Sequence, residues 1–86
     1  MRLLLRGRAQ VLCGGRAMRA AVRPVSGMLD RRRYGEYVQD MLRLLLPCDA
    51  VIHPGDLLTV SDAPYVCVRT RAFPGHLQCD VRRRLD

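Results

Sequence analysis

The clearest hydrophobic pattern in the chain lies between Asp30 and Pro47. Its apolar residues recur at the three- and four-residue spacing of one helix face. They are Tyr34, Tyr37, Val38, Met41, Leu42 and Leu45. Asp30 can cap the start of such a helix, with Met28 or Leu29 as an apolar staple, and Pro47 ends it. The pattern therefore predicts an amphipathic helix whose apolar face packs in a core.

The hydrophobic period changes after Pro47. Two short β-prone runs, Ala50–His53 and Leu57–Val60, flank the turn signal Pro54-Gly55-Asp56. A second turn signal, SDAP at 61–64, precedes YVCVRT, in which apolar and other residues alternate. The alternation predicts a β-hairpin that pairs Leu57–Val60 with Tyr65–Arg69.

The final segment, AFPGHLQCDVRRRLD, predicts a second helix. Pro74 suits the first turn of a helix, and Leu77, Val81 and Leu85 follow at four-residue intervals. The predicted fold class is therefore α+β, a small helix–β-hairpin–helix body over residues 30–86. One hairpin provides too little sheet to cover both helices. We therefore expect a partner to cover the apolar positions Tyr34, Tyr37, Val38, Met41, Leu42 and Leu45 and the hairpin residues Tyr65, Cys67 and Arg69.

Charge divides the chain into two parts. All 15 cationic side chains are arginine, against eight acidic residues, and the formal net charge is +7. Residues 1–29 hold six arginines and no acid, whereas residues 30–86 are nearly neutral. Such a basic, helical or disordered leader is typical of a mitochondrial transit peptide, and Pro24 and Gly27 mark its boundary. The alternative is a basic tail that stays attached and binds a partner or RNA.

Few residues are arranged for chemistry. The four cysteines include no CxxC pair, so we expect no zinc or iron–sulfur site. Cys48 and His53 carry no local signature of a nucleophile and its base. Apolar runs such as Leu44–Leu46 are far too short for a membrane span. We therefore predict no catalytic, cofactor-binding or metal-binding residue and no transmembrane span.

One stretch resembles a known family. The segments YGEYVQDMLRLLLP (34–47) and LLTV with YVCVR, followed by a second helix, resemble the start of the thirty-kilodalton subunit of respiratory complex I. That subunit is also called NADH dehydrogenase iron–sulfur protein 3. The resemblance implies a scaffold of the peripheral arm near the quinone end. It also implies no catalytic role and no iron–sulfur cluster in this subunit.

The sequence thus predicts a non-catalytic accessory subunit of a mitochondrial respiratory complex, most naturally complex I, on the matrix side of the inner membrane. Its expected partners are the other subunits of that large complex, and it needs no cofactor of its own. The alternative is a small mitochondrial ribosomal or RNA-associated protein. In that case the arginine triplets at 31–33 and 82–84 would contact phosphates. A third possibility is a thiol switch that uses Cys48, Cys67 or Cys79.

Overall fold

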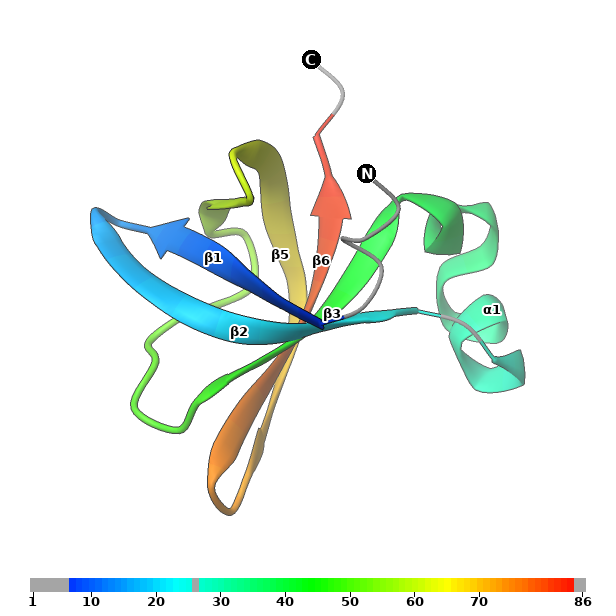
Figure 1. Cartoon of the computed structure of the whole chain (residues 1–86). Helices are drawn as coiled ribbons and strands as arrows, with labels where there is room; N and C mark the ends of the chain where they lie inside the picture. Colours follow the sequence, from blue (N-terminus) through cyan, green and yellow to red (C-terminus); the bar gives the residue numbers. More distant parts are fainter. Residues whose placement is uncertain (1–6, 26, 85–86) are drawn as a thin grey trace.

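The protein is a closed antiparallel β-barrel with a helical segment on its outside (Figure 1). The computed structural model describes residues 7–25 and 27–84. Within them the strands run in the order β1-β2-β3-β6-β5-β4, and β4 pairs with β1 to close the barrel. The strands are β1 (Gly7–Cys13), β2 (Arg16–Pro24), β3 (Met41–Pro47), β4 (Leu57–Val60), β5 (Ala63–Phe73) and β6 (His76–Arg83). The predicted helix–hairpin–helix body is therefore wrong.

The barrel covers its own core. Alternate residues of each strand point inward, so β3 contributes Leu42, Leu44 and Leu46 to the interior. The inward side chains of β1 and β2 meet them there, with Val11 0% and Val22 2% exposed. Closure also removes the free sheet edges that the single predicted hairpin would have left. The core therefore needs no partner to bury it.

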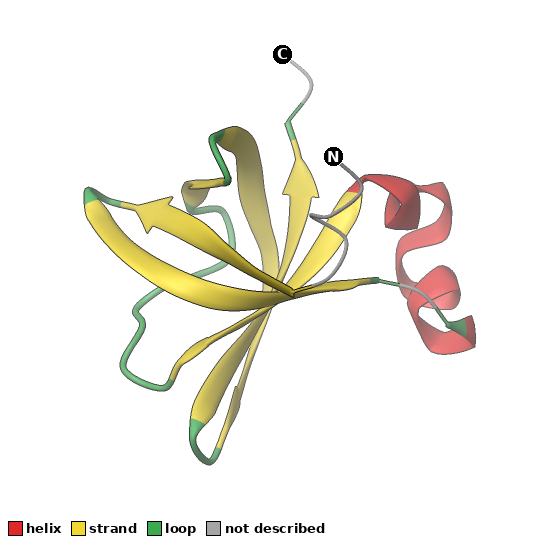
Figure 2. Cartoon of the chain, viewed as in Figure 1, coloured by secondary structure: helices red, strands yellow, loops and turns green. Residues whose placement is uncertain are grey.

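The predicted helix between Asp30 and Pro47 splits into three elements. α1 (Met28–Tyr34) and the 3₁₀ helix η2 (Gly35–Asp40) are followed by strand β3. The run Met41–Leu46 fits helical spacing, but it equally fits a strand with both faces buried. The run is a strand with both faces buried, because η2 contacts β3 and β6 from outside the barrel. Figure 2 shows the helical segment beside the strands rather than among them.

The second predicted helix is strand β6. The interval that places Leu77 and Val81 on one helix face also places them on one face of a strand, together with Cys79. β6 pairs along its length with β3 and β5, so its backbone hydrogen bonds are satisfied by strands on both sides. Pro74 and Gly75 form the turn between β5 and β6 instead of opening a helix.

The predicted leader supplies two strands of the barrel. β1 and β2 form a hairpin around Gly14 and Gly15, whose φ values of 60° and 81° suit the mirror-image turn that matches strand twist. Inward and outward residues alternate along both strands, and the inward ones are Ala9, Val11, Ala20 and Val22. This is the two-residue period of a strand, which sequence reasoning missed because the segment is rich in arginine. Residues 7–24 are therefore not a helical or disordered leader, and a chain starting at residue 30 would lack β1 and β2.

The predicted hairpin forms, but its second strand begins earlier than expected. β4 pairs with residues 63–66 and not with Tyr65–Arg69, because Ala63 and Pro64 already belong to β5. β4 spans Leu57–Val60 and pairs with β5 in a register that places Leu58 opposite Tyr65. The turn at 53–56 also forms: the Asp56 carboxylate accepts the backbone N–H of His53 at 2.8 Å. The β-prone run Ala50–His53 does not form a strand.

Candidate functional site

A row of charged residues crosses the outer face of four adjacent strands. The registers place Arg23 of β2 opposite Arg43 of β3, Arg43 opposite Asp80 of β6, and Asp80 opposite Arg69 of β5. Side chains directly opposite one another in a sheet lie close enough to interact. Asp80 thus lies between two arginines, and Arg43 lies between another arginine and this carboxylate.

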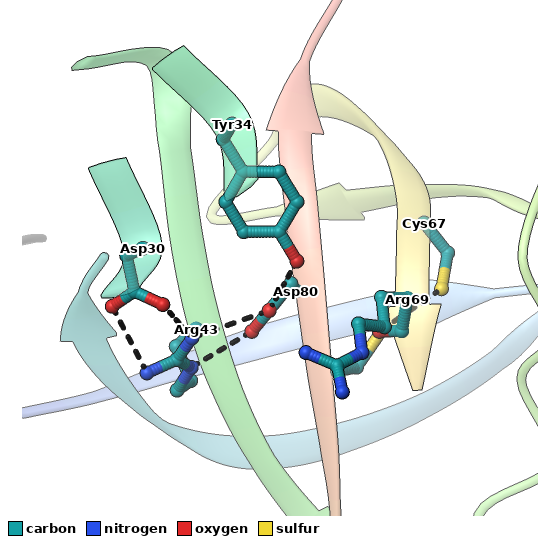
Figure 3. A network of polar contacts seen from close by, with 7 residues as sticks. Asp30, Tyr34, Arg43, Cys67, Arg69 and Asp80 are labelled. Atoms are coloured by element: carbon teal, nitrogen blue, oxygen red, sulfur yellow. Dashed lines mark hydrogen bonds and ion pairs between the residues drawn. The ribbon is translucent and has the colours of Figure 1, made fainter. Parts of the chain in front are cut away.

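Arg43 binds two carboxylates at once. Its Nε donates to Asp80 Oδ1 at 2.8 Å, and its Nη2 donates to Asp80 Oδ2 at 3.2 Å. Nη2 also donates to Asp30 Oδ1 at 3.0 Å (Figure 3). Asp80 is 2% exposed and Asp30 8%, so both carboxylates are largely removed from water. The hydrogen bonds that Arg43 donates to Asp80 and to Asp30 raise the pKa of Arg43 above its usual value and keep it charged.

Tyr34 completes this network from α1. Its hydroxyl donates to Asp80 Oδ2 at 2.7 Å. Burial, followed by the hydrogen bond to the Asp80 carboxylate, raises the pKa of Tyr34, although the cation of Arg69 opposes the rise. We call Asp30, Tyr34, Arg43 and Asp80 the Arg43 network.

The Arg43 network fastens the helical segment to the barrel. Asp30 and Tyr34 are four residues apart on α1, so they project from one helix face toward the strands. Farther along, the guanidinium of Arg82 lies 4.8 Å from the centre of the Tyr37 ring, which adds a cation–π contact between η2 and β6. The sequence placed Asp30 as an N-cap, but Gly27 takes that position and Asp30 is an ion-pair partner.

The helical segment also exposes apolar side chains. Met28 is 76% exposed, Leu29 74% and Tyr37 57%. α1 therefore inverts the usual arrangement, since it turns a carboxylate and a phenol inward and two large apolar side chains outward. A buried polar group and an exposed apolar patch are each more informative than an isolated exposed leucine. We call Met28, Leu29 and Tyr37 the apolar arm surface, and the exposed Arg31, Arg32 and Arg33 lie within the same segment.

Two buried thiols meet inside the barrel. The sulfur atoms of Cys67 and Cys79 are 3.1 Å apart, and both side chains are buried. Hydrogen bonding to Cys67, together with burial, raises the pKa of Cys79, whereas hydrogen bonding to Cys79 lowers the pKa of Cys67. The predicted thiol-switch residues thus divide into this pair and the exposed Cys48.

The predicted interface residues are distributed over the whole barrel. Leu42, Tyr65 and Cys67 belong to the core, and Met41 is buried on the outer side of β3. Leu45, Val38 and Arg69 are half-buried on β3, η2 and β5. The structure describes all of the predicted interface residues, and among them Tyr37 alone is more than half exposed. Within the segment Tyr65–Arg69, Tyr65 and Val66 pair with β4 on one side and with β6 on the other.

Sequence reasoning missed the Arg43 network. The helical pattern assigns Arg43 to the charged face of one helix and Asp80 to a second helix. The two residues are 37 positions apart, and the strand register brings them together. No local pattern in the sequence signals this pair.

Two absences apply to the described residues. No group of three or more His, Cys, Asp and Glu side chains within 7–25 and 27–84 is arranged to hold a metal ion. In that same part of the chain, no helix is both long and apolar enough to cross a membrane.

Comparison of the chain with protein-family models, with curated proteins and with solved structures finds no match in any of the three.

Proposed function

We propose that this protein is a non-catalytic structural subunit that docks onto a partner protein through the apolar arm surface. The observation that supports this is the inverted helix α1, which buries Asp30 and exposes Met28 and Leu29. Burying one such apolar side chain contributes roughly 1.5–3 kcal/mol. Docking would therefore gain up to an amount of this order for each of Met28 and Leu29.

The apolar arm surface is held in place before any partner arrives. The Arg43 network ties α1 to β3 and β6, and Arg82 contacts the Tyr37 ring. Surfaces fixed in their bound arrangement lose less conformational entropy on association. This fixed position supports a docking role over a loose terminal segment.

Charge favours a particular kind of partner. Arg31, Arg32 and Arg33 are exposed beside Met28 and Leu29, and the chain carries a net charge of +7. A second copy of the chain would bring like charges together, which opposes association. The complementary partner is a protein surface with an apolar centre and an acidic rim.

The prediction of a respiratory complex does not enter this proposal. Its resemblance depends on a helix over Tyr34–Pro47, and residues 41–47 form strand β3 instead. Location in mitochondria stays a prediction from composition. The proposal therefore names the chemistry of the partner surface and not a particular complex.

The experiment compares two pairs of substitutions in cells that naturally make the protein. Met28→Ser with Leu29→Ser removes the centre of the apolar arm surface. Val51→Ser with Leu57→Ser is the control, because these side chains are also 69% and 57% exposed but lie away from α1. We expect the unchanged protein and the control to migrate in a large complex on native gels, and the arm variant to migrate as a free monomer. Unfolding midpoints in purified protein confirm that both variants fold.

Two results contradict the proposal. One is an unchanged protein that migrates as a free monomer at native concentration. The other is an arm variant that stays in the complex as fully as the control does.

A further inference from the structure

The outer face of β1 and β2 carries three arginines around a small residue. Arg8 of β1 lies opposite Ala21 of β2, and Arg19 and Arg23 lie two residues to either side of Ala21 on the same face of β2. The side chains that line the hollow at this place include those of Arg8, Ala21 and Arg23, and the hollow has a volume of about 630 Å³. Gly7, Val22 and Pro24 complete the lining, so the hollow lies at the Arg8–Arg23 end of the face and does not reach Arg19. We call Arg8, Arg19 and Arg23 the β1–β2 arginine face.

These three arginines have no partner in the described part of the chain. All three are exposed, and no hydrogen bond or ion pair within residues 7–25 and 27–84 involves them. Arg16, on the same hairpin, differs because it pairs with Asp49 at 3.3 Å. The carboxylates of Asp30 and Asp80, farther across the sheet, are already bound to Arg43. Within residues 7–25 and 27–84, therefore, no acidic side chain neutralises the positive charge of the face.

The chemistry of the face fits phosphate groups in a regular row. Guanidinium groups bind phosphate oxygens in a bidentate, planar fashion. Arg8 lies diagonally across the strand pair from both Arg19 and Arg23. Diagonal neighbours in a sheet are about 7–8 Å apart, a separation comparable with that of neighbouring phosphates along a nucleic-acid strand. We propose that the β1–β2 arginine face binds the phosphate backbone of a nucleic-acid duplex.

The other residues of these strands favour a duplex over two rival anions. Neither strand contains an aromatic residue, so the face has nothing on which the bases of a single strand could stack. The outward residues beside the three arginines are Gln10 and Ala21, with Leu12 opposite Ala17 at the hairpin end of the face. Leu12, at 43% exposed, is the one large apolar side chain among them, and a single leucine gives little apolar surface to insert into a lipid surface. Binding through phosphates alone predicts no preference for base sequence.

This site differs from the one that the sequence indicated. The arginine triplets at 31–33 and 82–84 were the expected phosphate contacts, and Arg82 instead lies over the Tyr37 ring. Arg31, Arg32 and Arg33 are exposed on α1 and match the β1–β2 arginine face in number and charge. They therefore provide a matched control for the effect of net charge.

The test measures how binding depends on salt. The probe is a labelled DNA duplex about two helical turns long, and fluorescence anisotropy gives its dissociation constant between 50 mM and 200 mM salt. Three neutralised phosphates contribute a slope of about −2.7 in log–log form, equivalent to roughly a 40-fold loss of affinity over this range. We expect the variant Arg8→Gln/Arg19→Gln/Arg23→Gln to lose that part of the slope. The control Arg31→Gln/Arg32→Gln/Arg33→Gln should retain most of it.

A second measurement does not depend on the variants. On titration of the unchanged protein with the same duplex, the backbone amide resonances of β1 and β2 should shift more than those of β5. Larger shifts in β5, or none at all, would overturn the proposal.

Other outcomes also overturn it. Equal loss of slope in both triple variants would mean that net charge alone drives binding. Binding of anionic vesicles or polyglutamate through these arginines, without binding of the duplex, would assign the face to a lipid or an acidic protein. Thermal unfolding of both variants, with equal midpoints, confirms that the substitutions leave the barrel intact.

Discussion

Substitution of Arg43 by methionine tests the role of the Arg43 network. The change keeps an unbranched apolar stem of similar length but removes the guanidinium that binds Asp30 and Asp80. Asp80, at 2% exposed, is then buried without its main counter-charge. Breaking a buried ion pair by removing one partner typically costs about 3–5 kcal/mol.

We expect a loss near the lower end of that range. The Arg43 side chain is 22% exposed, so water screens part of its interaction. Tyr34 still donates to Asp80 after the substitution. A domain of this size has a free energy of unfolding of about 4–13 kcal/mol, so a loss of about 3 kcal/mol is a large fraction of the total.

The assay is urea unfolding followed by far-ultraviolet circular dichroism. The control is Arg31→Met, the same substitution at an exposed position of α1, for which we expect a change within about 0.5 kcal/mol. The m-value should stay constant, because the barrel exposes the same surface on unfolding. A double substitution with Asp80→Asn should cost less than the sum of the two single changes, since the two side chains interact directly.

Two results would refute the reasoning. If Arg43→Met costs no more than Arg31→Met, the network does not stabilise the fold. If the double substitution is strictly additive, Arg43 and Asp80 do not act on each other despite their 2.8 Å contact.

Three further predictions follow from the fold. Ala20→Asp should abolish cooperative unfolding, because it puts an unpaired charge at a fully buried position. The control Ala17→Asp, outward on the same strand, should leave the urea midpoint nearly unchanged. Equal midpoints for the two variants would mean that β2 is not part of the barrel. Tyr34→Phe should cost about 1.5–3 kcal/mol at pH 7 through the lost hydrogen bond to a carboxylate. The folded-state pKa of Tyr34 is raised, so this difference in the free energy of unfolding should persist below about pH 10 and shrink as the pH rises through the folded pKa. A difference that is the same at pH 7 and pH 11 contradicts this prediction. Cys48, which is exposed, should react with iodoacetamide at the rate of a free thiol, and Cys79, which is fully buried, more than about a thousandfold slower; mass spectrometry of labelled peptides checks both rates.

Local signals predicted one part of the fold correctly. The hairpin of β4 and β5 was found because its turn residues and its alternation lie within a few positions of one another. Helices were predicted where β3 and β6 form because Leu42 and Leu46, or Leu77 and Val81, are four residues apart, an interval that suits either element. Only a neighbouring strand on each side decides between them, and that neighbour is distant in sequence.

The candidate site was less predictable than the fold. Tyr34 and Tyr37 were selected for an apolar helix face, yet Tyr34 donates to a buried aspartate and Tyr37 covers an arginine. Met28 and Leu29 were placed at the end of a leader, and they are the most exposed large apolar residues of α1. Their exposure follows from which face of α1 the Arg43 network holds against the barrel.

Near neighbours along the chain were enough to indicate the turns on either side of β4, the alternation of β5 and the density of arginine. The tertiary structure decided what depends on register. It made strands of residues 7–24, closed the barrel by pairing β1 with β4, and set Arg43 opposite Asp80. The physical reason is that backbone pairing and burial are shared between segments tens of residues apart, so neither segment alone specifies which of its faces turns inward.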